Sequence, residues 1–69
     1  MTLDQWGLNA YIVGSSDDVQ TSLDWLEANE QWAAQVIELD NVKGVRRVLL
    51  RFDTATDLAA FAATNGQTT

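Results

Sequence analysis

Alternating apolar and polar positions near the start of the chain predict a β-strand over residues 8–15. In LNAYIVGS, Leu8, Ala10 and Ile12 belong to one face, and the residues between them belong to the other. β-branched and aromatic residues followed by Gly-Ser-Ser are typical of a strand that runs into a turn. We expect residues 1–5, which precede this strand, to fray.

The apolar period then changes to that of a helix. Val19, Leu23 and Leu26 form one stripe between residues 16 and 31. Ser15 and Asp18 have the spacing of a capping box, which marks a helix start. A helix is therefore predicted here, ending near the polar residues 29–31.

Residues 53–66 repeat this pattern. Thr54 and Asp57 have capping-box spacing, Leu58 and Phe61 begin a stripe, and an Asn-Gly pair closes the segment. This predicts a second helix, after which residues 67–69 should fray.

Residues 32–39 fit either a continuation of the first helix or a strand. We favour a strand, because a five-residue loop at 40–44 would pair it with residues 45–52 and match apolar side chains across the hairpin. The predicted pairs are Leu39 with Val45, Val36 with Val48, Ala34 with Leu50, Trp32 with Phe52, and Glu38 with Arg46.

These elements predict one α+β domain over residues 1–69, in the order β-α-β-β-α. A right-handed crossover gives a three-stranded antiparallel sheet of order 1-3-2 with both helices on one face. This is the ferredoxin-like arrangement without its last strand. The outer edge of the first strand would then be unpaired, and it is a second candidate docking site.

The sheet face away from the helices is the main candidate site. An uncovered sheet face normally carries polar residues, whereas this one combines aliphatic side chains with two arginines. The other interpretation is that β-propensity alone places such residues on strands. The predicted face comprises Tyr11, Val13, Ala33, Gln35, Ile37, Leu39, Val45, Arg47, Leu49 and Arg51.

Charge is divided unevenly along the chain, whose net charge is −6. Residues 1–42 hold eight acids and no base, and residues 43–69 hold four bases and two acids. This distribution repels nucleic acid on average and favours a basic protein partner. The predicted acidic helix surface is a solvated face or an imitation of nucleic acid, and it comprises Asp17, Asp18, Asp24, Glu27 and Glu30.

No residue pattern predicts catalysis, a metal site or a cofactor. The chain contains neither histidine nor cysteine, the commonest general base and the soft metal ligand. Asp17 and Asp18 are adjacent at a helix start, where carboxylates usually cap. The N-terminus lacks the basic segment of a signal peptide, and no apolar run reaches the roughly 20 residues of a membrane span. We expect a cytoplasmic, non-enzymatic protein.

The segments WLEAN (Trp25 to Asn29) and FDTATDLAAFAATNG (Phe52 to Gly66) resemble a diffuse group of small uncharacterised phage and bacterial βαββα proteins. That group has a WxxxN helix and a C-terminal strand-helix unit of the form FxD…F…G, though Leu58 replaces its usual alanine. The resemblance implies a phage or mobile-element origin, in which small acidic proteins often inhibit or redirect a host protein.

The first functional hypothesis is therefore a module that docks on another protein through the open sheet face and the acidic helix surface. One alternative is a nucleic-acid-associated module that uses Tyr11, Arg47 and Arg51. A further alternative is a structural subunit that buries the sheet face in a homodimer.

Overall fold

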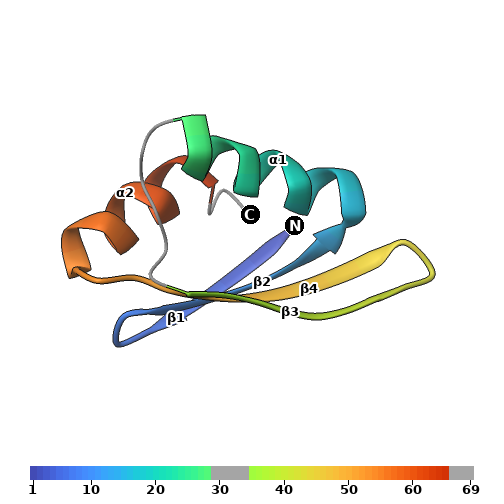
Figure 1. Ribbon diagram of the computed structural model, residues 1–69, viewed down its shortest axis with the longest axis horizontal. Coiled ribbons are helices and arrows are strands. Elements are labelled where there is room, and N and C mark those ends of the chain that lie inside the picture. The colour runs from blue at the N-terminus through green and yellow to red at the C-terminus, as the bar shows by residue number, and fades with distance from the viewer. Residues whose placement is uncertain (29–34, 66–69) are drawn as a thin grey trace.

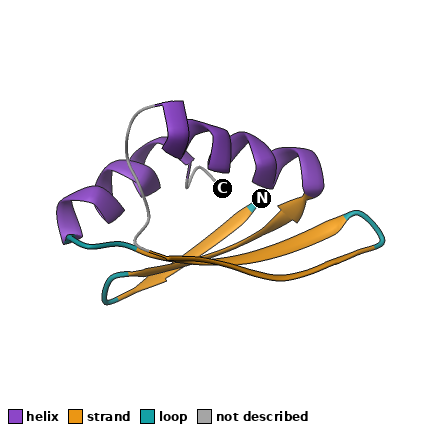
Figure 2. Cartoon of the chain, in the orientation of Figure 1, coloured by secondary structure: helices purple, strands orange, loops and turns teal. Residues whose placement is uncertain are grey.

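Two helices lie on one face of a four-stranded antiparallel sheet in the computed structural model, which describes residues 1–28 and 35–65 (Figure 1). The α+β class and the single helical layer agree with the sequence prediction, and Figure 2 shows the two layers by element type. The elements are β1 (Thr2–Trp6), β2 (Asn9–Ser15), α1 (Ser16–Ala28), β3 (Gln35–Val42), β4 (Val45–Arg51) and α2 (Ala55–Asn65).

Strand β1 corrects the predicted topology. It pairs antiparallel with β2, from Thr2 opposite Val13 to Trp6 opposite Asn9, so the sheet order is β1-β2-β4-β3. Gly7 has a φ of 55° and is the first of two residues in the β1–β2 connection, a position that suits glycine in tight hairpins. The predicted three-stranded sheet, the fraying of residues 1–5 and the unpaired edge of β2 are therefore wrong. Strand β1 fills the place that the missing last strand would leave open.

The β3–β4 hairpin confirms a strand at Gln35–Val42 but corrects its predicted register. Its turn has two residues, Lys43 and Gly44, with φ of 53° and 80°, instead of a five-residue loop. Two-residue turns with both φ values positive match the twist of paired strands, so residues 40–42 stay in the ladder. Val36 consequently lies opposite Leu50 instead of Val48.

A β-bulge lies at Leu39, between the pairs that Glu38 and Asp40 make with β4. One extra residue at that point shifts the pairing of β3 with β4, so that Asp40 lies opposite Arg47 and Val42 lies opposite Val45. Before the bulge the register differs from the predicted one by two residues. A shift of two leaves each side chain on its predicted face, because side chains alternate with period two. The predicted partners Trp32 and Ala34 lie outside the described residues.

The core lies between the helices and the two central strands, β2 and β4. Phe61 of α2 packs at its centre, with ring-centroid distances of 5.5 Å to Phe52 and 6.0 Å to Trp25. Val36 was expected in this core but is 52% exposed, because α1 packs on β2 and β4 and β3 lies at the sheet edge. The buried hydrophobic residues are Ala10, Ile12, Val19, Leu26, Val48, Leu50, Phe52, Leu58 and Phe61.

Both predicted helix starts are confirmed by their hydrogen bonds. The amide of Asp18 donates to Ser15 Oγ at 3.1 Å, and the amide of Asp57 donates to Thr54 Oγ1 at 3.1 Å. Each bond satisfies one of the amide groups that a helix leaves without a partner in its first turn. These local signals fix where the helices begin.

Candidate functional site

One face of the sheet has no helix over it, as Figure 1 shows. The strand register places its side chains in rows that cross the strands, since residues paired across a ladder share a face. We call this surface the open face. Its members are Thr2, Asp4, Trp6, Asn9, Tyr11, Val13, Ser15, Gln35, Ile37, Asp40, Val42, Val45, Arg47, Leu49 and Arg51.

The register brings together most of the residues that the sequence predicted for this site. Leu39 is the exception, because it sits in the bulge without a ladder partner, where it is 44% exposed. Ala33 lies outside the described residues. The members that share the open face as predicted are Tyr11, Val13, Gln35, Ile37, Val45, Arg47, Leu49 and Arg51.

The structure adds seven residues that the predicted face did not include: Thr2, Asp4, Trp6, Asn9, Ser15, Asp40 and Val42. Asp4 and Trp6 were missed because no strand was predicted before residue 8, and Asp40 and Val42 were missed because the β3–β4 turn is shorter than expected. The usable signals were a glycine directly after Trp6 and the Lys-Gly pair after Val42, since glycine in a two-residue connection between alternating segments indicates a hairpin.

The open face is apolar along much of its surface. Trp6 and Val42 are 53% and 57% exposed, Val45 is 48% exposed and Ile37 is 37% exposed. Tyr11 and Leu49 are half-buried neighbours on the two central strands. Every strand of the sheet thus contributes an apolar or aromatic side chain, a distribution typical of an interaction surface.

Arg47 is held by neighbours on the same face. Its Nε donates to Asp40 Oδ1 at 2.8 Å, its Nη2 forms an ion pair with Oδ2 of that carboxylate, and its Nη1 donates to the Tyr11 hydroxyl at 3.4 Å. The hydrogen bonds from Arg47 lower the pKa of Asp40, and those from Arg47 to Asp40 and Tyr11 raise the pKa of Arg47. Arg47 and Tyr11 are therefore oriented by each other and are not free for a phosphate or a base.

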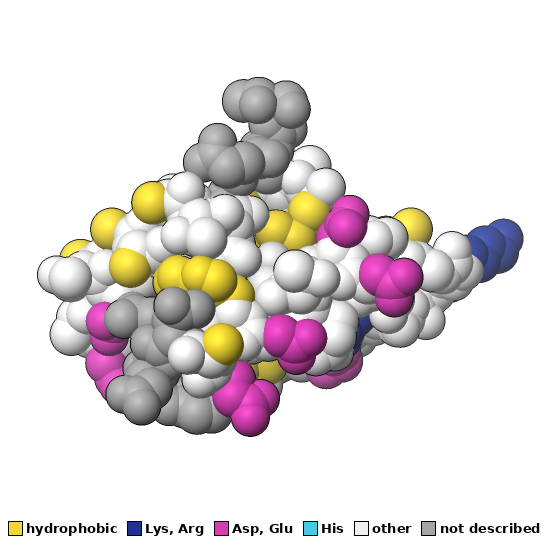
Figure 3. Space-filling model, turned by 90° about the horizontal axis from the view of Figure 1, so that it is seen from above, with side chains coloured by type: hydrophobic (Ala, Val, Ile, Leu, Met, Phe, Trp, Pro, Cys, Tyr) yellow, Lys and Arg dark blue, Asp and Glu magenta, His cyan; other side chains and the backbone are white. Residues whose placement is uncertain are grey.

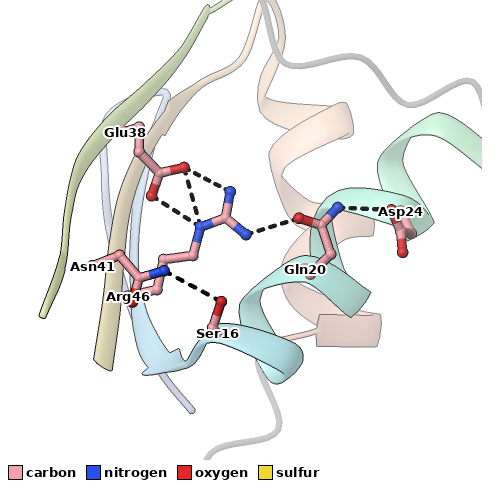
Figure 4. Close-up of polar contacts among 6 residues, drawn as sticks. All are labelled: Ser16, Gln20, Asp24, Glu38, Asn41 and Arg46. Atoms are coloured by element: carbon pink, nitrogen blue, oxygen red, sulfur yellow. Dashed lines mark hydrogen bonds and ion pairs between the residues drawn. The ribbon is translucent and has the colours of Figure 1, made fainter. Parts of the chain in front are cut away.

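Arg46 of β4 lies on the opposite face, and its side chain lies between Glu38 of β3 and Gln20 of α1 (Figure 4). Its guanidinium donates to both carboxylate oxygens of Glu38 at 2.6–3.1 Å, and its Nη1 donates to Gln20 Oε1 at 2.8 Å. Hydrogen bonds from Arg46 lower the pKa of Glu38. The predicted contact between Glu38 and Arg46 thus forms, although their direct ladder partners are Val48 and Asn41.

The four cations consequently divide among separate surroundings. Arg46 and Arg47 are paired on opposite faces, and Lys43 occupies the β3–β4 turn. Within residues 1–28 and 35–65, Arg51 makes no ion pair. Among the residues that the structure describes, one cation alone, Arg51, is therefore available on the open face to meet a charge on a partner.

The acidic helix surface lies on the other side of the molecule. Gln20 Nε2 donates to Asp24 Oδ1 at 2.9 Å, and the other acids of α1 extend into solvent. Figure 3 shows acidic side chains spread over the helical layer. Of the predicted surface, Asp17, Asp18, Asp24 and Glu27 are exposed on α1, and Glu30 lies outside the described residues.

Chemistry of other kinds has no assembled site in the described part of the chain. No group of three acidic side chains there is arranged to hold a metal ion, and no cavity is present to hold a cofactor. No helix among these residues is long and apolar enough to cross a membrane.

Comparisons of this chain with protein-family models, curated proteins and solved structures found no match. The resemblance to small phage and bacterial proteins therefore stays a prediction. Function has to be inferred from the open face, the acidic helix surface and the contacts between their residues.

Proposed function

We propose that this chain is a small non-enzymatic protein-binding module that docks through the open face. The observation that supports this most directly is the exposure of Trp6, Ile37, Val42 and Val45 on a face without a helix over it. Burying apolar area of this kind is the main driving force for most protein association.

The acidic helix surface has a secondary role in this proposal. It lies on the helical layer, so one globular partner seated on the open face does not reach it. Its like charges keep the chain soluble and steer approaching molecules, because they act over about a Debye length of 8–10 Å at physiological salt.

Nucleic-acid binding is the second candidate, and Arg51 supports it as an unpaired cation in the same row as Trp6. Two contacts weaken this candidate. Asp40 neutralises Arg47, and the Tyr11 hydroxyl accepts a hydrogen bond from Arg47. Labelled single-stranded RNA at low salt tests this function directly. We expect no salt-dependent binding, and affinity that falls steeply with added salt would favour it over protein docking.

A phage-encoded modulator or inhibitor of a host protein is one specific form of the docking proposal. It rests on the sequence resemblance, and no contact among the described residues bears on the source of the chain. It remains a prediction about the partner.

A matched pair of substitutions on one strand tests whether docking uses the open face. Ile37 and Val36 are adjacent exposed residues of β3 that face opposite sides of the sheet. Ile37→Asp places a charge on the open face, whereas Val36→Asp makes the same change on the helix side. We expect proteins retained by the wild type in pull-downs to be lost with Ile37→Asp and kept with Val36→Asp. Equal retention by both variants would show that docking uses another surface.

A further inference from the structure

The distribution of charge over the fold indicates what covers the open face. Resting on the docking function proposed above, we propose that its occupant is a second copy of this chain, packed face to face in a two-fold symmetric dimer. The two helical layers would then lie on the outside of a four-layer assembly.

The first argument is that the open face is electrically neutral although the chain carries a net charge of −6. Asp4 and Asp40 contribute two negative charges to this face, and Arg47 and Arg51 contribute two positive charges. Glu38 and Arg46 neutralise each other on the helix side. The acids that remain belong to α1, to α2, to the link between β4 and α2, or to the undescribed residue Glu30.

Two copies therefore repel each other through their helical layers but not through their open faces. Face-to-face packing also places the two acidic helix surfaces on opposite sides of the dimer, where their separation is largest. A symmetric interface must be complementary to itself, and equal numbers of acids and bases avoid a net like charge on the two surfaces that meet.

Unpaired charges on the open face provide a second argument. Among the described residues, Asp4 and Arg51 make no ion pair, and they lie on different strands in neighbouring rows. In a two-fold dimer each contact occurs twice, so an acid and a base on the same face offer two equivalent ion pairs. These charges flank Tyr11 and Leu49, the apolar pair at the middle of the face.

The sheet edges are poorer routes to a dimer. At one edge, β1 of one copy could pair antiparallel with β1 of the second copy. Pairing centred on Asp4 would place this acid opposite the Asp4 of the second copy, and like charges directly opposite each other destabilise strand pairing. On the other edge, the bulge at Leu39 interrupts the regular ladder of β3.

The size of the face is compatible with a stable dimer. The principal extents of the molecule are 33 × 23 × 18 Å, and the sheet and helical layers are stacked along the middle one in Figure 1. The rectangle that bounds a layer is therefore about 600 Å², which corresponds to the lower end of specific interfaces, about 600 Å² per partner. A 69-residue chain also has a small core, and association is a common way to stabilise one.

Sedimentation equilibrium of the wild type, Ile37→Asp and Val36→Asp tests the proposal, over about 1 µM to 1 mM protein. The monomer mass is 7.6 kDa. We expect the wild type and Val36→Asp to reach twice this mass, and Ile37→Asp to dissociate at least tenfold more readily while its circular dichroism stays native.

Each outcome separates the dimer from the more general docking function. A wild type that stays monomeric over the whole range overturns the dimer but leaves the open face free for a different protein, so the pull-down still tests docking. Dimerisation weakened equally by both variants, or weakened only by Val36→Asp, overturns face-to-face packing. If Ile37→Asp unfolds, Tyr11→Asp and Leu49→Asp repeat the test from the central strands, and a folded variant that still dimerises like the wild type refutes the proposal.

Discussion

Replacement of Arg46 tests how the edge strand is held to the helical layer. Its guanidinium connects Glu38 on β3 with Gln20 on α1, and its side chain is 15% exposed. Arg46→Ala removes both the polar contacts and the covered stem, whereas Arg46→Met keeps a stem of similar length. The two variants therefore separate the contribution of hydrogen bonding from that of packing.

The expected magnitudes follow from these exposures. Glu38 is 47% exposed, so loss of its ion pair costs about 0.5–1 kcal/mol. Arg46→Ala also loses two covered methylenes, worth about 0.8 kcal/mol each, which brings its cost to about 2 kcal/mol. A chain of 69 residues is stabilised by about 3–10 kcal/mol, so both losses are measurable.

Urea denaturation followed by tryptophan fluorescence gives the free energy of unfolding of each variant at a fixed protein concentration. Lys43→Met serves as the control, because it likewise replaces a cation with an uncharged stem at a residue of the β3–β4 turn that has no ion pair among the described residues and lies outside the open face. It should leave the free energy of unfolding nearly unchanged. If Arg46→Met costs as much as Arg46→Ala, the stem does not contribute as argued; if neither lowers stability, the contacts to Glu38 and Gln20 do not form in solution.

Three other expectations concern the core, the turn and the carboxylates. Phe61→Ala should lower the free energy of unfolding by about 3–5 kcal/mol, since the ring is fully buried against Phe52 and Trp25. Thermal melting should show this variant partly or completely unfolded, whereas Phe61→Leu should keep a cooperative transition. Lys43→Asn should raise the melting temperature, because Lys43 has a φ of 53° and asparagine tolerates this region better. Gly44→Ala should lower the melting temperature, because alanine at a φ of 80° costs about 1–2 kcal/mol of strain. An unchanged melting temperature in both variants would contradict the assigned turn. The pKa values of Glu38 and Asp40 are lowered in the folded chain from 4.5 and 3.8, so their stabilisation is present above those values and is lost as pH falls through the lower folded pKa values. Urea midpoints measured from pH 7 down to about pH 2 should fall in that acidic window, and the fall should be smaller in Glu38→Gln/Asp40→Asn.

Local signals in the sequence predicted the helices and most of the open face. The capping residues Ser15 and Thr54 act within three residues of themselves, and their effect does not depend on the rest of the fold. Face assignment for Ile37 and Leu49 was also predictable, because a register error of two residues preserves the alternation of faces.

The missed elements depend on contacts between distant parts of the chain. Strand β1 carries an exposed tryptophan and a carboxylate, and it becomes a strand because β2 offers an unpaired edge beside it. The exposure of Val36 could not be predicted from its apolar neighbours, since it depends on how far the helical layer extends over the sheet. The ion pair of Arg47 with Asp40 was also not predictable, because only the bulge and the two-residue turn bring Asp40 beside Arg47.

The sequence by itself determined which residues alternate, where the helices begin, and that one sheet face carries aliphatic side chains and arginines. These properties follow from the side-chain period of each element and from capping within one turn. The tertiary structure decided that the sheet has a fourth strand, that Arg47 is neutralised by Asp40, and that acids and bases balance on the open face. Register and edge pairing bring together residues that are far apart in sequence, so charge complementarity across the sheet emerges only when the strands are in place.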